Sequence, residues 1–231
     1  MQAPTAQRFQ VARKAVVAAC LQLADRGFLA GIGGNIALRA DDEHFAVTPS
    51  AADYYSLTPQ DICILRLDDL TQVAGEMRPS VESGMHAALL RRRLDLNASV
   101  HTHQPIASAI ALLNRELLVV DPAARAALGP TVVLTKYAPS GTSFLMQAFA
   151  KVLRDDANGY LLRNHGIVCG GEDLGQAARN VEHIEAEAAR YIEAGIQRNL
   201  QTVAGQQLRE RAAGVLEQSL RAVQQHQTLQ A

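Results

Sequence analysis

Short apolar segments alternate with helical segments along this chain, but they do not follow a strict strand–helix–strand repeat. Some strand-like segments are direct neighbours: residues 28–38 and 45–48 are joined by the polar turn 41–43, which predicts a β-ribbon. Neighbouring strands of this kind pair antiparallel, whereas intervening helices cover the faces of the sheet. We therefore expect an α/β fold, a single three-layer α/β/α domain with a central mixed, largely antiparallel sheet.

The remaining elements are predicted from apolar periodicity and from stop signals. The Gly170-Gly171 pair predicts a turn, and Ser80 is the expected N-cap of the helix that follows it. We expect one domain over residues 1–231 with its core over about 8–195, followed by an amphipathic helix over 205–224 and a Gln-rich tail. Helices are predicted over 7–26, 80–93, 106–113, 143–154 and 173–194, and strands over 62–65, 98–103, 117–120, 132–134 and 160–163.

Composition excludes several classes of protein. Apolar residues make up 48% of the chain and charged residues 19%, which is enough apolar surface for a sizeable core. The 22 basic and 23 acidic residues give a net charge of −1, so the chain lacks the excess of basic residues that would predict nucleic acid as a partner. No apolar run approaches the roughly 20 residues of a membrane span. Three widely spaced cysteines without a CxxC pair indicate a reducing compartment, and we expect a cytoplasmic protein.

Two histidines, His101 and His103, stand at positions i and i+2 of a predicted strand. Side chains at this spacing point to the same face, so both imidazoles can reach one metal ion. A pair of hydrogen-bonded surface histidines explains the same spacing equally well. His165 lies at the end of another predicted strand, where a lone histidine is more often structural than ligating. The three together suit a divalent transition metal with an open position for substrate.

Glu82 falls on the first turn of the helix predicted over 80–93, where the helix N-terminus favours a carboxylate. It is either an ordinary helix-start acid or a displaceable fourth metal ligand that becomes a base when substrate binds. His86 follows four residues later on the same helix face. A core or capping role is the more common one for such a histidine.

Three short segments offer backbone N–H groups and small hydroxyls without a Lys or Arg. They are Gly33-Gly34-Asn35, Thr48-Pro49-Ser50 and the helix start at Ser80. Each alone is an ordinary turn, but in combination they can bind phosphate or carboxylate.

In this order, the Gly-Asn, Thr-Pro-Ser, Pro-Ser-x-Glu, His-x-His and Asn-His-Gly motifs resemble the class II aldolase/adducin family over roughly residues 8–195. The resemblance implies that the three histidines hold zinc or a similar divalent ion and that Glu82 is the catalytic acid/base and a metal ligand. Its epimerase relatives carry an aspartate there, so Glu82 favours carbon–carbon bond chemistry. The residues that the resemblance assigns to metal are Glu82, His101, His103 and His165, and those it assigns to a phosphate pocket are Gly34, Asn35, Ser50 and Ser80.

Tyr137 resembles a tyrosine that the aldolases use near the reacting carbons, often across a subunit boundary, although a packing tyrosine fits equally well. Two positions depart from the family pattern. Ala51 stands where glycine is usual, and Val81 stands where a second phosphate-binding serine is common. The phosphate is then held differently, or the substrate carries a carboxylate or no anion.

The resemblance implies an enzyme that cleaves a small hydroxy-ketone or sugar phosphate by a retro-aldol reaction through a metal-stabilised enolate. Decarboxylation of a β-keto or aromatic acid, or dehydration, can use the same site, and adducin-type relatives are binding domains without catalysis. Zinc is the default metal, with manganese, cobalt and iron as alternatives. The family pattern also implies a homotetramer with active sites at subunit boundaries.

Overall fold

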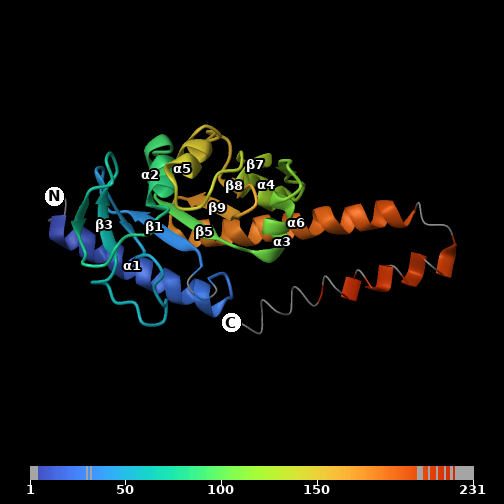
Figure 1. Ribbon diagram of the computed structural model, residues 1–231, viewed down its shortest axis with the longest axis horizontal. Helices are drawn as coiled ribbons and strands as arrows, with labels where there is room; N and C mark the ends of the chain where they lie inside the picture. The colour runs from blue at the N-terminus through green and yellow to red at the C-terminus, as the bar shows by residue number, and fades with distance from the viewer. Residues whose placement is uncertain are drawn as a thin grey trace.

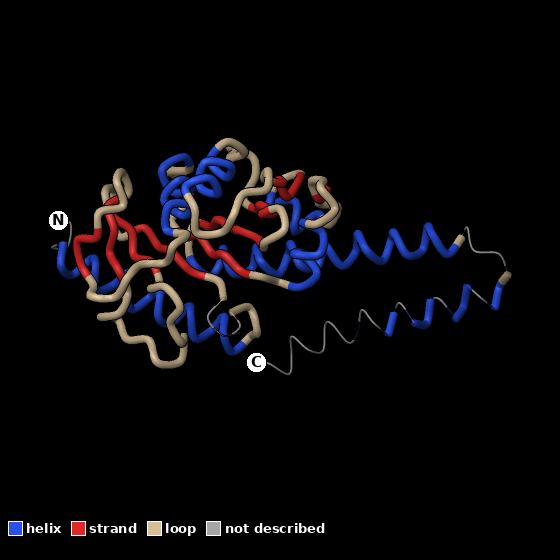
Figure 2. Tube along the Cα trace, in the orientation of Figure 1, coloured by secondary structure: helices blue, strands red, loops and turns tan. Residues whose placement is uncertain are grey.

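The computed structural model describes residues 5–29, 31, 33–201, 205–207, 209–211, 213–215, 217–218 and 221. Within these residues one nine-stranded sheet runs through the molecule (Figures 1 and 2). Only β7 and β8 pair parallel, and every other neighbouring pair is antiparallel. This confirms the predicted mixed, largely antiparallel sheet. In spatial order the strands are β4 (Gln72–Ala74), β3 (Cys63–Arg66), β2 (His44–Val47), β1 (Asn35–Arg39), β5 (Ala98–Thr102), β9 (Gly166–Gly171), β8 (Gly159–Leu162), β7 (Thr131–Leu134) and β6 (Leu117–Leu118).

Helices cover both faces of the sheet, which confirms the three-layer arrangement. In Figure 1, α2 and α5 lie above the sheet, and α1 and α6 lie below it. Successive side chains of a strand point to opposite faces of the sheet, so each face has its own part of the core. Ile36 packs on the side of α1 and α6, whereas its neighbour Ala37 packs against α2 on the other side. The helices are α1 (Thr5–Asp25), α2 (Ser83–Arg92), α3 (Pro105–Ala111), α4 (Pro122–Leu128), α5 (Ser143–Ala150) and α6 (Leu174–Leu200).

The start of α2 differs from the prediction. The helix begins at Ser83, and Glu82 rather than Ser80 occupies its N-cap position. Residues 80–83 instead form a turn, in which the Glu82 N–H donates to Ser80 Oγ (3.2 Å) and the Ser83 hydroxyl donates to the Ser80 carbonyl (2.7 Å). The Glu82 side chain makes no capping bond because its carboxylate is engaged elsewhere, as described below.

The turn predicted at Gly170-Gly171 is also wrong, because both residues belong to β9. The glycines are needed for close packing. A Cβ at Gly170 would lie 2.5 Å from Leu96 Cδ1, and one at Gly171 would lie 2.4 Å from the backbone nitrogen of Ala177. A glycine inside a strand often marks such a close approach.

Several element ends shift by a few residues. The first ribbon strand begins only at Asn35, α5 ends at Ala150 and α6 continues to Leu200. Helix α4 was not predicted, although Asp121 caps it by accepting from the Ala124 N–H (2.9 Å) and Gly129, with φ +90°, ends it. The predicted helix over 205–224 lies partly outside the described residues, and the Gln-rich tail lies wholly outside them.

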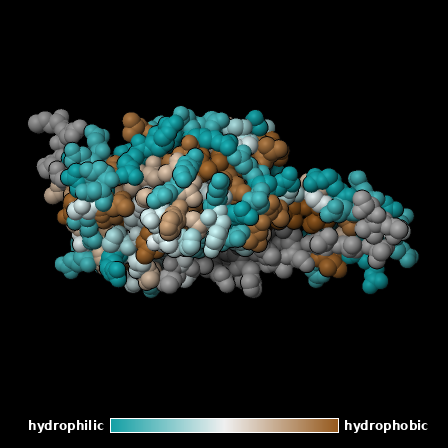
Figure 3. Space-filling view, turned by 45° about the horizontal axis from the view of Figure 1, so that its top comes forward, coloured by the Kyte–Doolittle hydropathy of each residue, from teal (hydrophilic) through white to brown (hydrophobic). Residues whose placement is uncertain are grey.

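No helix in the described part of the chain combines the length and apolar character needed to cross a membrane. In Figure 3, polar residues spread over most of the visible face, with apolar patches between them. All three cysteines are free and buried.

Candidate functional site

Three histidines meet at one end of the central strands. His101 is on β5, His103 follows that strand, and His165 lies in the turn between β8 and β9. Because β5 pairs antiparallel with β9, Thr102 is opposite Ile167, and the turn before β9 therefore lies beside the end of β5. One ligand atom from each histidine lies within 4.8 Å of the others. His101 is fully buried, His165 is half-buried and His103 is exposed, so the cluster is accessible to solvent from the His103 side.

The His101 ring is oriented by a backbone carbonyl of the neighbouring strand, β9. Nδ1–H donates to the Ile167 carbonyl (2.8 Å), which leaves the lone pair of the neutral ring on Nε2. Nε2 is buried and forms no hydrogen bond, yet it lies 3.2 Å from Glu82 Oε2. Two electron-rich atoms held this closely in a buried position need a cation between or beside them, which is either a proton on the ring or a metal ion. Three imidazoles and a carboxylate are a donor set that divalent transition metals prefer, so these residues fit a metal ion.

His103 and His165 are held in the neutral form that binds metal. Although His103 as a residue is exposed, partial desolvation of its ring lowers its pKa to about 4, with a further contribution from the neighbouring imidazoles, and desolvation lowers the pKa of His165 in the same way. Both rings therefore carry a free lone pair at neutral pH.

Glu82 is buried beside this cluster and is held at both carboxylate oxygens. Asn35 Nδ2 donates to Oε2 (2.9 Å), and the Ser140 hydroxyl donates to Oε1 (2.8 Å). His165 Nε2 lies 3.4 Å from Oε1. Burial by itself raises the pKa of Glu82, but the nearby His101 ring and the two donors outweigh it and hold this pKa well below its usual range. The carboxylate is therefore ionised at neutral pH.

The sequence did not single out Ser140 for this contact, although Ser140 lies three residues after the predicted site residue Tyr137. It also did not reveal that Asn35 is linked to His86. Asn35 is opposite His101 in the β1–β5 ladder, and its Oδ1 lies 2.5 Å from Nε2 of the fully buried His86. The other ring nitrogen of His86 lies 2.7 Å from the hydroxyl of Ser99 on β5. His86 thus has the core location that its spacing indicated, and it also belongs to the hydrogen-bond network of Glu82.

The predicted phosphate-pocket residues lie near the Glu82 turn. The Ser80 N–H donates to the Thr48 carbonyl (3.1 Å) and the Ser50 N–H donates to the Arg78 carbonyl (2.9 Å), so the two segments run side by side. Ala51 has φ +53°, a conformation that favours glycine and explains why glycine is expected there.

Tyr137 lies on the loop between β7 and α5 with its side chain 59% exposed. It does not take part in the hydrogen bonds to Glu82, which come from Asn35 and Ser140. The catalytic role predicted for Tyr137 therefore stays a prediction.

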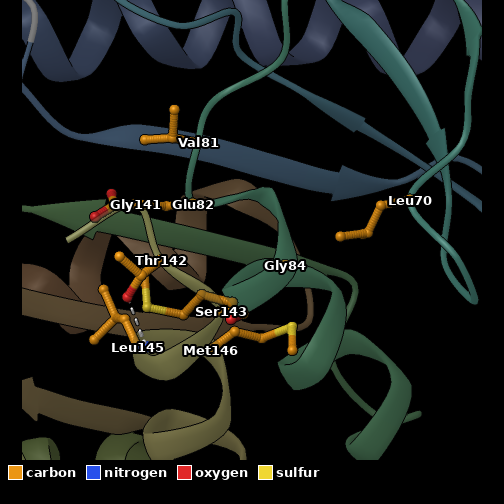
Figure 4. A pocket seen from close by; sticks show the side chains of 10 residues that line it. Leu70, Val81, Glu82, Gly84, Gly141, Thr142, Ser143, Leu145 and Met146 are labelled. Atoms are coloured by element: carbon orange, nitrogen blue, oxygen red, sulfur yellow. Dashed lines mark hydrogen bonds between the residues drawn. The ribbon is translucent and has the colours of Figure 1, made fainter. Parts of the chain in front are cut away.

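A cavity of about 280 Å³ lies between the N-terminal ends of α2 and α5. Figure 4 shows Leu70 on one side of it, Gly141 and Thr142 on the opposite side, and Met146 below. Val81 also lines this cavity, and its side chain is 67% exposed. Where the family commonly has a serine, this chain therefore presents an apolar side chain next to Glu82.

Gly34 is a position that tolerates no side chain. Its φ is +85°, and a Cβ would lie 2.6 Å from Leu29 Cδ2 and 2.7 Å from the His101 carbonyl oxygen. We expect Gly34→Ala to cost about 3 kcal/mol of unfolding free energy, from left-handed backbone strain plus overpacking. Gly31→Ala is the matched control, because Gly31 has φ +58° but open space around its Cβ, and we expect a loss of about 1 kcal/mol. Urea unfolding measures both, and equal losses would contradict the clash.

The buried His86 predicts a pH dependence of stability in the metal-free protein. Burial lowers its pKa to about 3, whereas the unfolded chain binds a proton near pH 6.5. Stability from this group is therefore complete above pH 6.5 and is lost as the pH falls from 6.5 toward 3. Between pH 7 and pH 5 we expect the wild type to lose about 2 kcal/mol more than His86→Gln, which cannot titrate. Urea unfolding at the two pH values measures the difference, and identical losses would refute the assignment.

Comparisons with known proteins agree with this geometry. The sequence profile of the family described as "Class II Aldolase and Adducin N-terminal domain" matches residues 14–192. A 5-deoxy-D-ribulose 1-phosphate aldolase from Bacillus thuringiensis is 36% identical over 185 residues, covering 80% of this chain and 85% of that protein. A 3-oxo-tetronate 4-phosphate decarboxylase from Haemophilus influenzae is 28% identical over 173 residues, covering 73% of this chain and 80% of that protein. A solved L-fuculose 1-phosphate aldolase structure matches with a TM-score of 0.75 at 28% identity, covering 90% of this chain and 96% of that one.

Proposed function

The chain belongs to the class II aldolase and adducin N-terminal domain family, and on this basis we propose that it is a metal-dependent lyase that cleaves a small hydroxy-ketone or sugar phosphate by a retro-aldol reaction. One observation carries the proposal. An ionised carboxylate, Glu82, is held by Asn35 and Ser140 directly beside three histidines in a partly open cluster.

His101, His103 and His165 would hold a divalent ion, with Glu82 as a ligand that substrate displaces. Zinc is the proposed metal because it binds imidazole and carboxylate well, and manganese, cobalt and iron are the alternatives that metal analysis would distinguish. Such an ion supplies Lewis acidity, which lowers the energy of the enolate left when a carbon–carbon bond breaks beside a carbonyl.

Glu82 is the proposed general base. Its carboxylate accepts the proton of the substrate hydroxyl that becomes the aldehyde, while the electron pair of the breaking carbon–carbon bond passes to the enolate. The donors on both oxygens hold the group in one orientation before substrate arrives. Tyr137 or a water then returns a proton to the enolate carbon.

Gly34, Asn35, Ser50 and Ser80 are the proposed contacts for a substrate phosphate. The backbone N–H groups of Ser50 and Ser80 already donate within the protein. We therefore assign the phosphate contacts of these two serines to their hydroxyl groups.

Product analysis tests the reaction type. The metal-loaded protein is incubated with 5-deoxy-D-ribulose 1-phosphate, L-fuculose 1-phosphate and a phosphorylated β-keto acid. Release of dihydroxyacetone phosphate together with an aldehyde supports the aldolase. The likeness to a decarboxylase keeps carbon dioxide release as the second candidate. A folded protein that binds metal but turns over none of the three substrates would favour a different reaction on this scaffold, and one that binds no metal would favour a binding domain.

We also propose a cytoplasmic homotetramer with active sites at the subunit boundaries. The three free, buried cysteines suit a reducing compartment. Large apolar side chains exposed near the β6 edge of the sheet, Leu112, Leu113, Leu118 and Val120, suit burial in an assembly. Light scattering of the purified protein tests the assembly, and a monomeric mass at micromolar concentration would overturn it.

A further inference from the structure

We propose that His86 is a positioning residue that holds Glu82 against the three-histidine cluster by fixing the orientation of the Asn35 side chain. The inference rests on the proposed function only for the identity of the reaction. Its geometric basis is a continuous chain of buried side chains, Ser99, His86, Asn35 and Glu82, each joined to the next by a hydrogen bond.

Glu82 determines which group donates and which accepts in each of these hydrogen bonds. The Glu82 carboxylate can only accept, so the atom of Asn35 that faces it must be the amide nitrogen, Nδ2. The Asn35 oxygen, Oδ1, consequently points to His86 and accepts from Nε2–H. In the neutral ring Nδ1 then carries the lone pair and accepts the Ser99 hydroxyl proton. A single proton arrangement satisfies every member, and it presents a donor to Glu82.

The location of His86 makes this arrangement difficult to replace. His86 and Ser99 are 0% exposed, and Asn35 and Glu82 are 6% and 7% exposed, so water has little access to substitute for a lost partner. His86 also joins three elements, because it lies on α2 and bonds to Asn35 on β1 and Ser99 on β5. Ser99 is two residues before His101 on the same strand face. The residue that orients Asn35 is thereby anchored to the strand that carries the buried histidine of the cluster.

Without a donor at position 86, Asn35 Oδ1 would be buried and unpaired, and the amide could rotate to present its oxygen to the carboxylate. That orientation repels Glu82 instead of holding it. Partners of this kind typically contribute 10- to 100-fold to metal affinity or activity. We therefore expect His86 to act on Glu82 and not on the fold alone.

Cobalt(II) binding to the full-length, metal-stripped protein is the primary test, read from the visible absorption of the ion and its dissociation constant. His86→Leu should keep one Co²⁺ per chain on the three intact histidines but weaken binding by about 10-fold or more. His86→Gln, whose amide can donate to Asn35 in place of Nε2–H, should stay within about 3-fold of wild type. Equal weakening in the Gln and Leu variants, or wild-type affinity in His86→Leu, would overturn the proposal.

A double-mutant cycle shows whether the effect passes through Asn35. In an Asn35→Ala background, His86→Leu should change the Co²⁺ dissociation constant by less than about 2-fold, because the link to Glu82 is already broken. The same weakening in both backgrounds would overturn the role of Asn35. Leu89→Val is the matched control for packing: this buried residue of α2 should lose stability without a change in Co²⁺ affinity.

Once product analysis identifies a substrate, its turnover gives a second measurement of the effect of His86. His86→Leu should lower kcat by 10- to 100-fold with little change in KM, and His86→Gln should restore most of it. The Co²⁺ measurements do not require turnover. Absence of activity in the wild type would therefore count against the proposed function alone, whereas an uncoupled cycle would count against His86 alone.

Discussion

Replacing Glu82 by glutamine is expected to lower kcat by about 10³-fold, the usual contribution of a general base in its place. The amide is nearly isosteric with the carboxylate, but it cannot accept a substrate proton. Glu82 is 7% exposed, and its two oxygens accept from Asn35 and Ser140. One of these donors would face the new amide nitrogen, so the side chain would also lose its fixed orientation.

Steady-state kinetics with a substrate found by product analysis measures the loss of kcat, and metal analysis of the same sample checks occupancy. Because Glu82 is also a proposed metal ligand, we expect the variant to bind metal more weakly on its three unchanged histidines, and kcat is therefore measured at saturating metal and expressed per bound ion. Glu172→Gln is the control, because Glu172 is exposed and follows β9 at the end of the strand opposite His165, so it should retain full activity. A Glu82→Gln variant within 10-fold of wild-type kcat would remove Glu82 from the chemistry.

The second large effect is expected for the metal itself. His103→Ala removes one of three imidazoles and should reduce bound metal from about one ion per chain to a small fraction, with turnover falling by a similar or larger factor. His103 is the best of the three to test because it is exposed, so its removal leaves no buried cavity. His101 is fully buried, and His101→Ala would combine metal loss with a packing defect.

Elemental analysis after dialysis measures the occupancy, and thermal unfolding verifies the fold. His183→Ala on α6 is the control, since it removes a histidine outside the cluster and should keep the metal. Unchanged metal content in His103→Ala would show that the ion, if present, binds elsewhere. Metal lost equally in both variants would indicate adventitious binding to histidines in general.

The central part of the site followed from short-range patterns in the sequence. A spacing of two on a strand is enough to predict that His101 and His103 share a face, and the strand does place both rings near one point. The sheet, its antiparallel ribbon and most helices followed from periodicity in the same way. These features depend on neighbours within a few residues, which a sequence displays directly.

The parts that were missed depend on contacts between distant segments. Ser140 reaches Glu82 across 58 residues, and His86 reaches Asn35 across 51. No local pattern marks either residue, because their roles arise only when the loop after β7 and the helix α2 pack onto the sheet. The glycines of β9 were interpreted as a turn for a related reason: their need for space comes from Leu96 and Ala177, which are distant in the chain or belong to the next element.

The position of β5 at the centre of the sheet has a consequence for biosynthesis. β5 carries His101 and needs partners on both sides, β1 from the beginning of the chain and β9 from much later. The carbonyl that orients His101 belongs to Ile167, 66 residues further on. During translation the two early histidines leave the ribosome long before His165 and β9 exist. The proposed metal centre can therefore assemble only after β9 has been made, and a nascent chain arrested before Gly166 should bind metal weakly.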